Sequence, residues 1–179
     1  MKGFIFTNFI DFIETSQGLE MVDEMITSCD LPSQGIYSSF NNYDFDKLVC
    51  LLTYVSKKTA VDPEILLEQF GVFVFPYLIG KHSYIIEHFD NAIDLIAGIE
   101  NHIHIEVKKL YNDADLPTFR VVEKTTKKLT MVYNSSKGLT YFAIGLIKET
   151  LNHFKVDGSV AIDKSFDLKM GVKFDIELH

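Results

Sequence analysis

Apolar residues in the first two thirds of the chain recur at the spacing of a helix that faces a core. Near the N-terminus Phe6, Phe9 and Ile13 carry this pattern and fall on one face of a helix over residues 4–15. The same spacing predicts further helices over 19–27, 44–57, 62–78 and 91–111. Residues 30–42 are rich in Ser, Asn, Pro and Gly, which predicts a loop.

The helix over 62–78 has the clearest start signal. Asp62 occupies the N-cap position, Pro63 the first helical position, and Glu64 the first turn. Proline lacks a backbone N–H and clashes with the preceding turn, so Pro76 is predicted to kink or end this helix.

After residue 117 the apolar period changes to two, which is typical of strands. Strands are predicted over 119–123 and 129–133, joined in a hairpin over 125–128. A helix over about 140–154 and two closing strands complete the chain, the strands lying over 159–163 and 169–178. This order predicts an α+β fold, with an N-terminal helical subdomain followed by a four-stranded antiparallel sheet with helices.

Length and charge narrow the function classes. The chain has 179 residues, which predicts one domain over 1–179, and a net charge of −8, which disfavours binding to nucleic acid or anionic membranes. The N-terminus lacks a signal-peptide pattern and no apolar run could span a membrane, so a cytoplasmic protein is expected.

Cys29 and Cys50 are predicted to be reduced, buried thiols. The common phosphate-loop, serine-hydrolase and zinc-protease motifs are absent, so we expect no enzymatic activity.

The helix over 91–111 contains two histidines in different surroundings. On a helical wheel His104 shares an apolar stripe with Ile96 and Val107, whereas His102 lies about 200° around the axis. His104 is therefore expected to face the interior. No carboxylate is evident beside it, so its ring needs another hydrogen-bond partner or a metal.

Two other interpretations of this segment stay open. His104 can be a hydrogen-bonded core histidine with no further role. If the segment were instead a strand, His102, His104 and Glu106 would share one face at period two, and two histidines with one carboxylate form the facial set of non-haem iron sites.

A second polar motif follows the strand over 129–133. Tyr133, Ser135 and Lys137 alternate, so an extended backbone would point all three in one direction. A phenol, a hydroxyl and an ammonium all donate hydrogen bonds to carboxylates, such as the propionates of a haem. A solvated strand end with a polar face would give the same pattern.

These segments together resemble the haem–nitric oxide/oxygen binding (H-NOX) domains, which are bacterial gas sensors related to the haem domain of soluble guanylate cyclase. The resemblance runs nearly from end to end. It is carried by Met1-Lys2-Gly3, the run from Asp62 to Gly71, Ile103–Tyr111, Ala114–Pro117, Met131–Tyr133, Gly138-Leu139 and Gly145–Ile147. The resemblance implies a haem b cofactor held between the helical subdomain and the sheet.

The resemblance also implies roles for individual residues. His104 corresponds to the proximal iron ligand, and Pro117 to a proline that presses on the haem. Tyr133 and Ser135 match the first two members of the family's Tyr-x-Ser-x-Arg clamp on the propionates, while Lys137 replaces the arginine. Lysine is a point charge without a planar fork, so a looser hold is expected. The other haem-contacting positions are apolar: Ile5, Phe9, Val74, Leu78, Phe142 and Leu146.

The family's ligand choice depends on polarity on the distal side of the haem. Iron-bound O₂ carries partial negative charge and needs a hydrogen-bond donor, which oxygen-binding members supply as a tyrosine. Here that position is Phe142, and the supporting positions are Phe9 and Val74. We therefore expect binding of NO, with CO as a weaker ligand, and no stable O₂ complex.

In this family, loss of the iron–histidine bond on NO binding shifts the histidine helix. Without an output domain of its own, the chain is expected to signal to a separate partner, such as a histidine kinase or a cyclic-dinucleotide enzyme. The cysteines of the structural zinc site found in some members are missing from residues 138–141 and 163–167. A haem-dependent enzyme, a haem carrier and the non-haem iron site stay open as alternatives.

Overall fold

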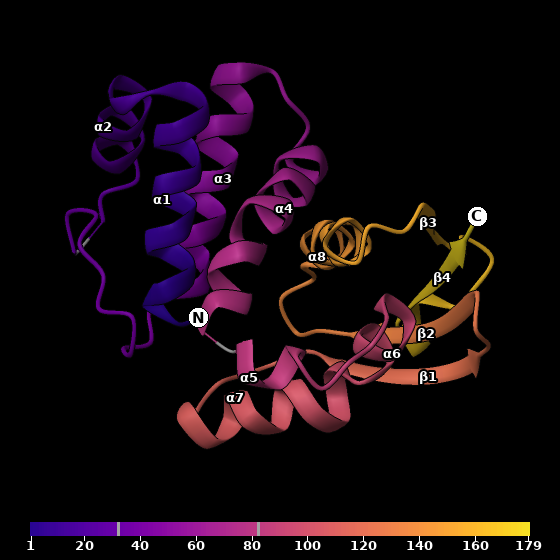
Figure 1. The fold of residues 1–179 in the computed structure, drawn as a ribbon. Coiled ribbons are helices and arrows are strands. Elements are labelled where there is room, and N and C mark those ends of the chain that lie inside the picture. The colour runs from indigo at the N-terminus through magenta and orange to yellow at the C-terminus, as the bar shows by residue number, and fades with distance from the viewer. Residues whose placement is uncertain (32, 82) are drawn as a thin grey trace.

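The computed structural model describes residues 1–31, 33–81 and 83–179, apart from the side chain of Lys81. Its N-terminal half is a group of helices, packed side by side in Figure 1. Their bounds are Gly3–Gln17 (α1), Leu19–Ser28 (α2), Phe45–Thr59 (α3) and Pro63–Lys81 (α4). The helices predicted over 4–15, 19–27, 44–57 and 62–78 are thus present, and so is the loop over 30–42, of which residue 32 lies outside the described residues.

Two of these helices begin at an aspartate cap. Asp44 Oδ1 accepts a hydrogen bond from the Asp46 N–H at 3.1 Å, and Asp62 Oδ1 accepts from the Glu64 N–H at 2.8 Å. The cap at Asp62 was predicted. Helix α4 continues past Pro76 to Lys81, so the proline does not end it. Across the described part of the chain, every helix is too short or too polar to cross a membrane.

The segment predicted as one helix over 91–111 is divided into three parts. It comprises an α-helix over Ala92–Ala97 (α6), a π-helical turn over Ile99–Ile103, and an α-helix over His104–Leu110 (α7). A short helix, α5 (Ser83–Ile86), precedes them. The prediction of one continuous α-helix is therefore wrong. A π-helical turn holds about one residue more than an α-helical turn, so side chains after it point in a different direction from the one that an unbroken α-helix predicts. His104 is the first residue after this turn.

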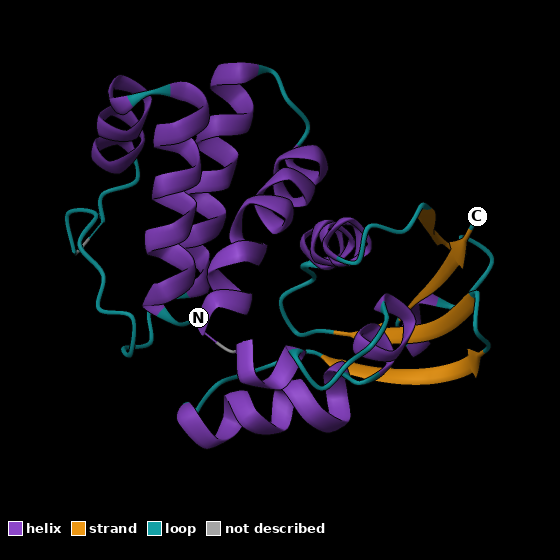
Figure 2. Cartoon of the chain, viewed as in Figure 1, coloured by secondary structure: helices purple, strands orange, loops and turns teal. Residues whose placement is uncertain are grey.

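The C-terminal half is an antiparallel sheet of order β1-β2-β4-β3, shown in orange in Figure 2. Its strands are Thr118–Lys124 (β1), Lys128–Asn134 (β2), Gly158–Ile162 (β3) and Val172–Leu178 (β4). The hairpin and the α+β class are confirmed. The last strand is shorter than predicted, because a 3₁₀ turn over Leu168–Met170 and Gly171, at φ 114°, precede it.

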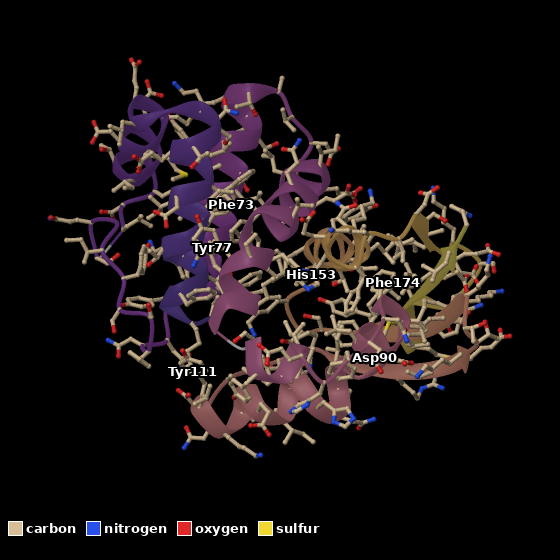
Figure 3. The ribbon with its side chains drawn as sticks, viewed as in Figure 1. Phe73, Tyr77, Asp90, Tyr111, His153 and Phe174 are labelled. Atoms are coloured by element: carbon tan, nitrogen blue, oxygen red, sulfur yellow. A yellow bond between two sulfur atoms is a disulfide. The ribbon has the colours of Figure 1, made fainter. Side chains whose placement is uncertain are left out.

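Helix α8 (Thr140–His153) lies between the helical half and the sheet (Figure 1). It crosses α4 so closely that a Cβ on Gly145 would lie 2.1 Å from the Glu68 carbonyl oxygen. One face of α8 packs on the helical core through Phe142 and Leu146, and the opposite face packs on the sheet core through Ile147. Figure 3 labels one residue of each core, Phe73 in the helical half and Phe174 on the sheet.

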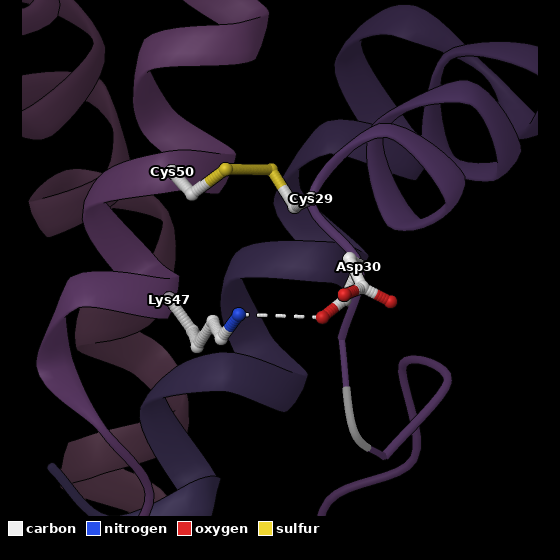
Figure 4. Close-up of a disulfide and its surroundings, with 4 residues drawn as sticks. All are labelled: Cys29, Asp30, Lys47 and Cys50. Carbon is white, nitrogen blue, oxygen red and sulfur yellow. Dashed lines mark hydrogen bonds between the residues drawn. A yellow bond between two sulfur atoms is a disulfide. The ribbon is translucent and has the colours of Figure 1, made fainter.

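Cys29 and Cys50 form a disulfide in the structure, with their Cα atoms 5.9 Å apart (Figure 4). The prediction of reduced thiols is wrong here. Cys29 follows α2 and Cys50 lies on α3, and the packing of these helices brings together two residues that are 21 positions apart. Nearby, the Lys47 ammonium donates to the Asp30 carbonyl oxygen at 3.3 Å. Cysteine count and spacing carried no information about this proximity.

Candidate functional site

His104 lies at the start of α7 with only 12% of its side chain exposed. Its Nδ1 is 3.3 Å from Oε2 of Glu100, which lies one turn earlier within the π-helical turn. The same Oε2 accepts a hydrogen bond from the Phe119 backbone N–H on β1 at 2.9 Å. The expectation that no carboxylate accompanies His104 is therefore wrong. The four-residue separation of Glu100 from His104 was the signal that could have revealed the pair.

This contact determines which ring nitrogen of His104 is available. Burial lowers the pKa of His104, with the nearby Glu100 carboxylate opposing that shift, so the imidazole is neutral at pH 7. A carboxylate can only accept a hydrogen bond, so Nδ1 carries the proton and Nε2 keeps its lone pair. No polar partner for Nε2 is found among the described residues. A metal-bound histidine has this arrangement, so the ring fits the role of an iron ligand.

The non-haem iron alternative is not supported. His102 is exposed, with its ring centroid 5.7 Å from that of Phe89, and Glu106 pairs with Lys109. Because all of these residues are helical, the period-two face that this alternative requires does not exist. Within residues 1–31, 33–81 and 83–179, no cluster of three His, Cys, Asp or Glu side chains could hold a metal ion.

The Tyr-x-Ser-x-Lys motif is not a continuous strand. Strand β2 ends at Asn134, and a turn follows in which the Lys137 N–H donates to Ser135 Oγ at 3.1 Å. The predicted extended backbone is therefore wrong beyond Asn134, although the Tyr133 and Ser135 side chains do meet in a hydrogen bond. Tyr133 is buried against the sheet core with 3% exposure, and this burial raises its pKa. The Lys137 ammonium, with 13% of its side chain exposed, pairs with Asp115.

The loop from α7 to β1 links the histidine helix to the start of α1. Asp113 accepts hydrogen bonds from the Lys2 ammonium at 2.7 Å and from the Asn42 amide at 2.6 Å. The ring centroid of Tyr111, at the end of α7 in Figure 3, lies 5.9 Å from that of Phe40. Pro117 is half-buried directly before β1. Sequence reasoning did not find Asp113 or Asp115, because their partners lie 111 and 22 residues away.

All six predicted apolar contact residues belong to the helical core, and we refer to them as the apolar cluster. Its members are Ile5, Phe9, Val74, Leu78, Phe142 and Leu146. Phe9 and Val74 are 1% and 0% exposed, while the other four are half-buried. Phe70, which sequence reasoning missed, connects the cluster, because its ring centroid lies 5.1 Å from that of Phe9 and 5.2 Å from that of Phe142.

Tyr141, the neighbour of Phe142, lies on the other side of α8. It packs with the sheet core, and its hydroxyl bonds to Glu64, which raises the pKa of the phenol. Its hydroxyl therefore does not enter the apolar cluster.

Comparisons with known proteins agree with this geometry. A family model described as haem-NO-binding matches residues 2–162. The chain is similar to the unliganded Fe(II) H-NOX protein of K. algicida, with 40% identity, 100% of this chain and 97% of that chain covered, and a TM-score of 0.94. A comparison with curated proteins found no match.

Two further structures show the same fold with different ligands. The H-NOX protein of S. oneidensis in the Fe(II)NO state is 25% identical, with 100% and 99% of the chains covered and a TM-score of 0.91. The IWP-051-bound H-NOX of Shewanella woodyi in the Fe(II)CO state is 32% identical, with 99% and 94% covered and a TM-score of 0.85. The chain therefore belongs to the haem-NO-binding (H-NOX) family of haem-binding gas sensors.

Proposed function

We propose that residues 1–179 form a single domain that binds haem b through His104 and senses nitric oxide. The observation that carries this proposal is the state of the His104 ring, in a chain of the haem-NO-binding family. Its Nδ1 is engaged by Glu100, so Nε2 can bind iron. When bound, haem supplies an iron centre that takes up a diatomic gas.

Polar groups of the chain would hold the two carboxylates of the cofactor. We assign this role to the Tyr133 phenol, the Ser135 hydroxyl and the Lys137 ammonium. The pair between Lys137 and Asp115 supports a weak contribution from Lys137, because one point charge is divided between two carboxylates. Pro117, fixed between α7 and β1, would contact the ring from the side of His104.

The apolar cluster would form the gas-binding side and determine ligand choice. None of its six side chains carries a hydrogen-bond donor, and the phenol of Tyr141, the neighbour of Phe142, is directed to Glu64. Bound O₂ needs a donor far more than NO or CO does. We therefore infer that NO is the physiological ligand, that CO binds more weakly, and that no stable oxy complex forms. The NO and CO states of the S. oneidensis and Shewanella woodyi relatives are compatible with this inference.

Signalling would begin with movement of His104. Its helix continues into the loop that Lys2 and Asn42 hold through Asp113, so a displacement of α7 reaches the start of α1. The two halves would then change their relative position, as a population shift that gas binding favours. We propose that a separate protein, either a histidine kinase or a cyclic-dinucleotide enzyme, reads this change.

The visible spectrum of the purified, reduced protein tests the proposal. We expect a Soret band of five-coordinate ferrous haem that changes on addition of NO and does not change in air. A persistent oxy spectrum would contradict the ligand assignment and leave haem binding intact. If no Soret band appears with haem supplied, haem binding itself is refuted.

A further inference from the structure

The carboxylate of Glu100 connects the histidine helix to the sheet. Its Oε2 lies 3.3 Å from His104 Nδ1 and 2.9 Å from the Phe119 backbone nitrogen. The His104 and Glu100 side chains are 12% and 30% exposed, so the bond lies largely away from water. A charge-assisted hydrogen bond is stronger in such surroundings than at the surface.

Phe119 fixes the other end of this connection. It lies on the edge strand β1, whose sheet neighbour is β2, with Phe119 paired to Tyr133. Its ring centroid lies 5.7 Å from that of His104 and 5.2 Å from that of Tyr133. The imidazole is therefore bonded to the Glu100 carboxylate, which β1 anchors, and packed beside an aromatic ring of the same strand.

A carboxylate bonded to Nδ1–H has two effects on a histidine that binds a metal through Nε2. It fixes the ring tautomer and orientation, and it makes the ligating nitrogen more basic. Loss of such a partner typically lowers metal affinity by about 10- to 100-fold. A carboxylate that only joined two segments of the chain would change stability and leave the metal–nitrogen bond unaltered.

We infer that Glu100 is a positioning residue that strengthens the bond between His104 and haem iron and thereby sets how readily NO breaks it. This inference rests on the proposed function. Helix α7 offers a matched control, because Glu106, two residues beyond His104, is a carboxylate with the same 30% side-chain exposure that pairs with Lys109 instead.

Resonance Raman spectroscopy of the reduced, gas-free protein tests the inference through the iron–histidine stretching frequency. We expect a downward shift in Glu100→Ala and a smaller one in Glu100→Gln, whose amide oxygen still accepts a hydrogen bond without a charge. Glu106→Gln should keep the wild-type frequency. Haem transfer to excess apomyoglobin should be about tenfold or more faster for Glu100→Ala than for the wild type.

The outcomes separate the inference from the proposed function. If the wild type binds haem and Glu100→Ala keeps its stretching frequency, the inference is overturned and the sensor proposal stands. A fall in thermal stability without a frequency shift assigns Glu100 a structural role only. If Glu106→Gln shifts the frequency as much as Glu100→Ala, the effect is one of general charge and the inference is again overturned. A wild type without a haem spectrum refutes both.

Discussion

The two sides of the candidate site differ in how their residues act. On the histidine side a buried ring is held by directed polar contacts, since Glu100 bonds both to His104 and to the Phe119 backbone. On the opposite side the apolar cluster offers ring faces and methyl groups from the helical core. The histidine side can supply a bond to iron, whereas the apolar cluster can only exclude water and offers no hydrogen-bond donor. Affinity for the cofactor and selectivity for the gas should therefore be separable by mutation.

Removal of the ligating ring should have the largest effect. His104→Gly removes the nitrogen that we assign to iron, so the spectrum of histidine-ligated ferrous haem should be lost completely and return when imidazole is added. Absorption spectra of the reduced protein measure this directly. His102→Gly is the matched control, because His102 is exposed two residues away and its loss should leave the spectrum unchanged.

A His104→Gly variant with a wild-type spectrum and a normal NO response would assign the iron to another residue. The contrast between the two sides would then no longer hold.

A donor placed in the apolar cluster should change selectivity while the histidine side stays intact. Phe142→Tyr adds a hydroxyl to a half-buried ring that packs on Phe70. We expect a persistent oxy spectrum in air, where the wild type has none, because a phenol can donate to bound O₂. A buried hydroxyl without a partner costs about 1–3 kcal/mol, so a lower melting temperature should accompany the change.

Tyr141→Phe is the control for this variant. It removes a hydroxyl directed to Glu64, outside the cluster, and should leave gas binding as in the wild type. An unchanged gas spectrum in Phe142→Tyr would show that the lack of hydrogen-bond donors in the apolar cluster does not determine the selectivity against O₂.

The disulfide provides a stability change confined to the helical half. Cys50→Ser opens a loop of 21 residues, and the chain-entropy relation gives a loss of about 3 kcal/mol. Urea unfolding should show this loss for the variant, and a comparable loss for the wild type with a reductant present. The iron–histidine frequency should not move, because the bridge joins α2 to α3, and both helices lie apart from α7 in Figure 1. Equal stability of both proteins under oxidising conditions would contradict the bridge.

Comparison with the sequence shows why the apolar side was easier to predict than the histidine side. Helical periodicity placed Phe9 in a core, and the Asp62 cap located the start of the helix that carries Val74, because both signals are local patterns. The π turn before His104 adds a single residue to a helical pattern, which periodicity cannot resolve over one turn.

The remaining errors concern contacts between distant segments. The pairing of Lys137 with Asp115 and the joining of Cys29 to Cys50 depend on tertiary packing, and no spacing rule encodes them. The Glu100 contact differs, since its separation from His104 was visible in the sequence. Only the hydrogen bond from the Phe119 N–H of β1 to Glu100 could not be predicted without the fold.

The smallest effect should come from the ion pair between Lys2 and Asp113, which joins the start of α1 to the loop after α7. The hydrogen bond from Lys2 is the main cause of the lowered pKa of Asp113. A carboxyl whose pKa is lower in the folded state contributes stability above its unfolded pKa of about 3.9 and loses that contribution as the pH falls through the folded value. Lys2→Met should therefore be slightly less stable than the wild type at pH 7, and the difference should shrink below about pH 4 and vanish only below the lowered folded pKa of Asp113.

Lys58→Met is the matched control for this pair, because it breaks a surface bridge to Glu24 of the same 2.7 Å length within the helical half. Its stability should show a similar pH dependence, since Lys58 lowers the pKa of Glu24. Amide hydrogen exchange distinguishes the two variants. Exchange over residues 112–116 should accelerate in Lys2→Met and stay at the wild-type rate in Lys58→Met, because Lys2, unlike Lys58, bonds to the loop that follows the histidine helix. Equal exchange rates in both variants would mean that Asp113 does not link the two sides.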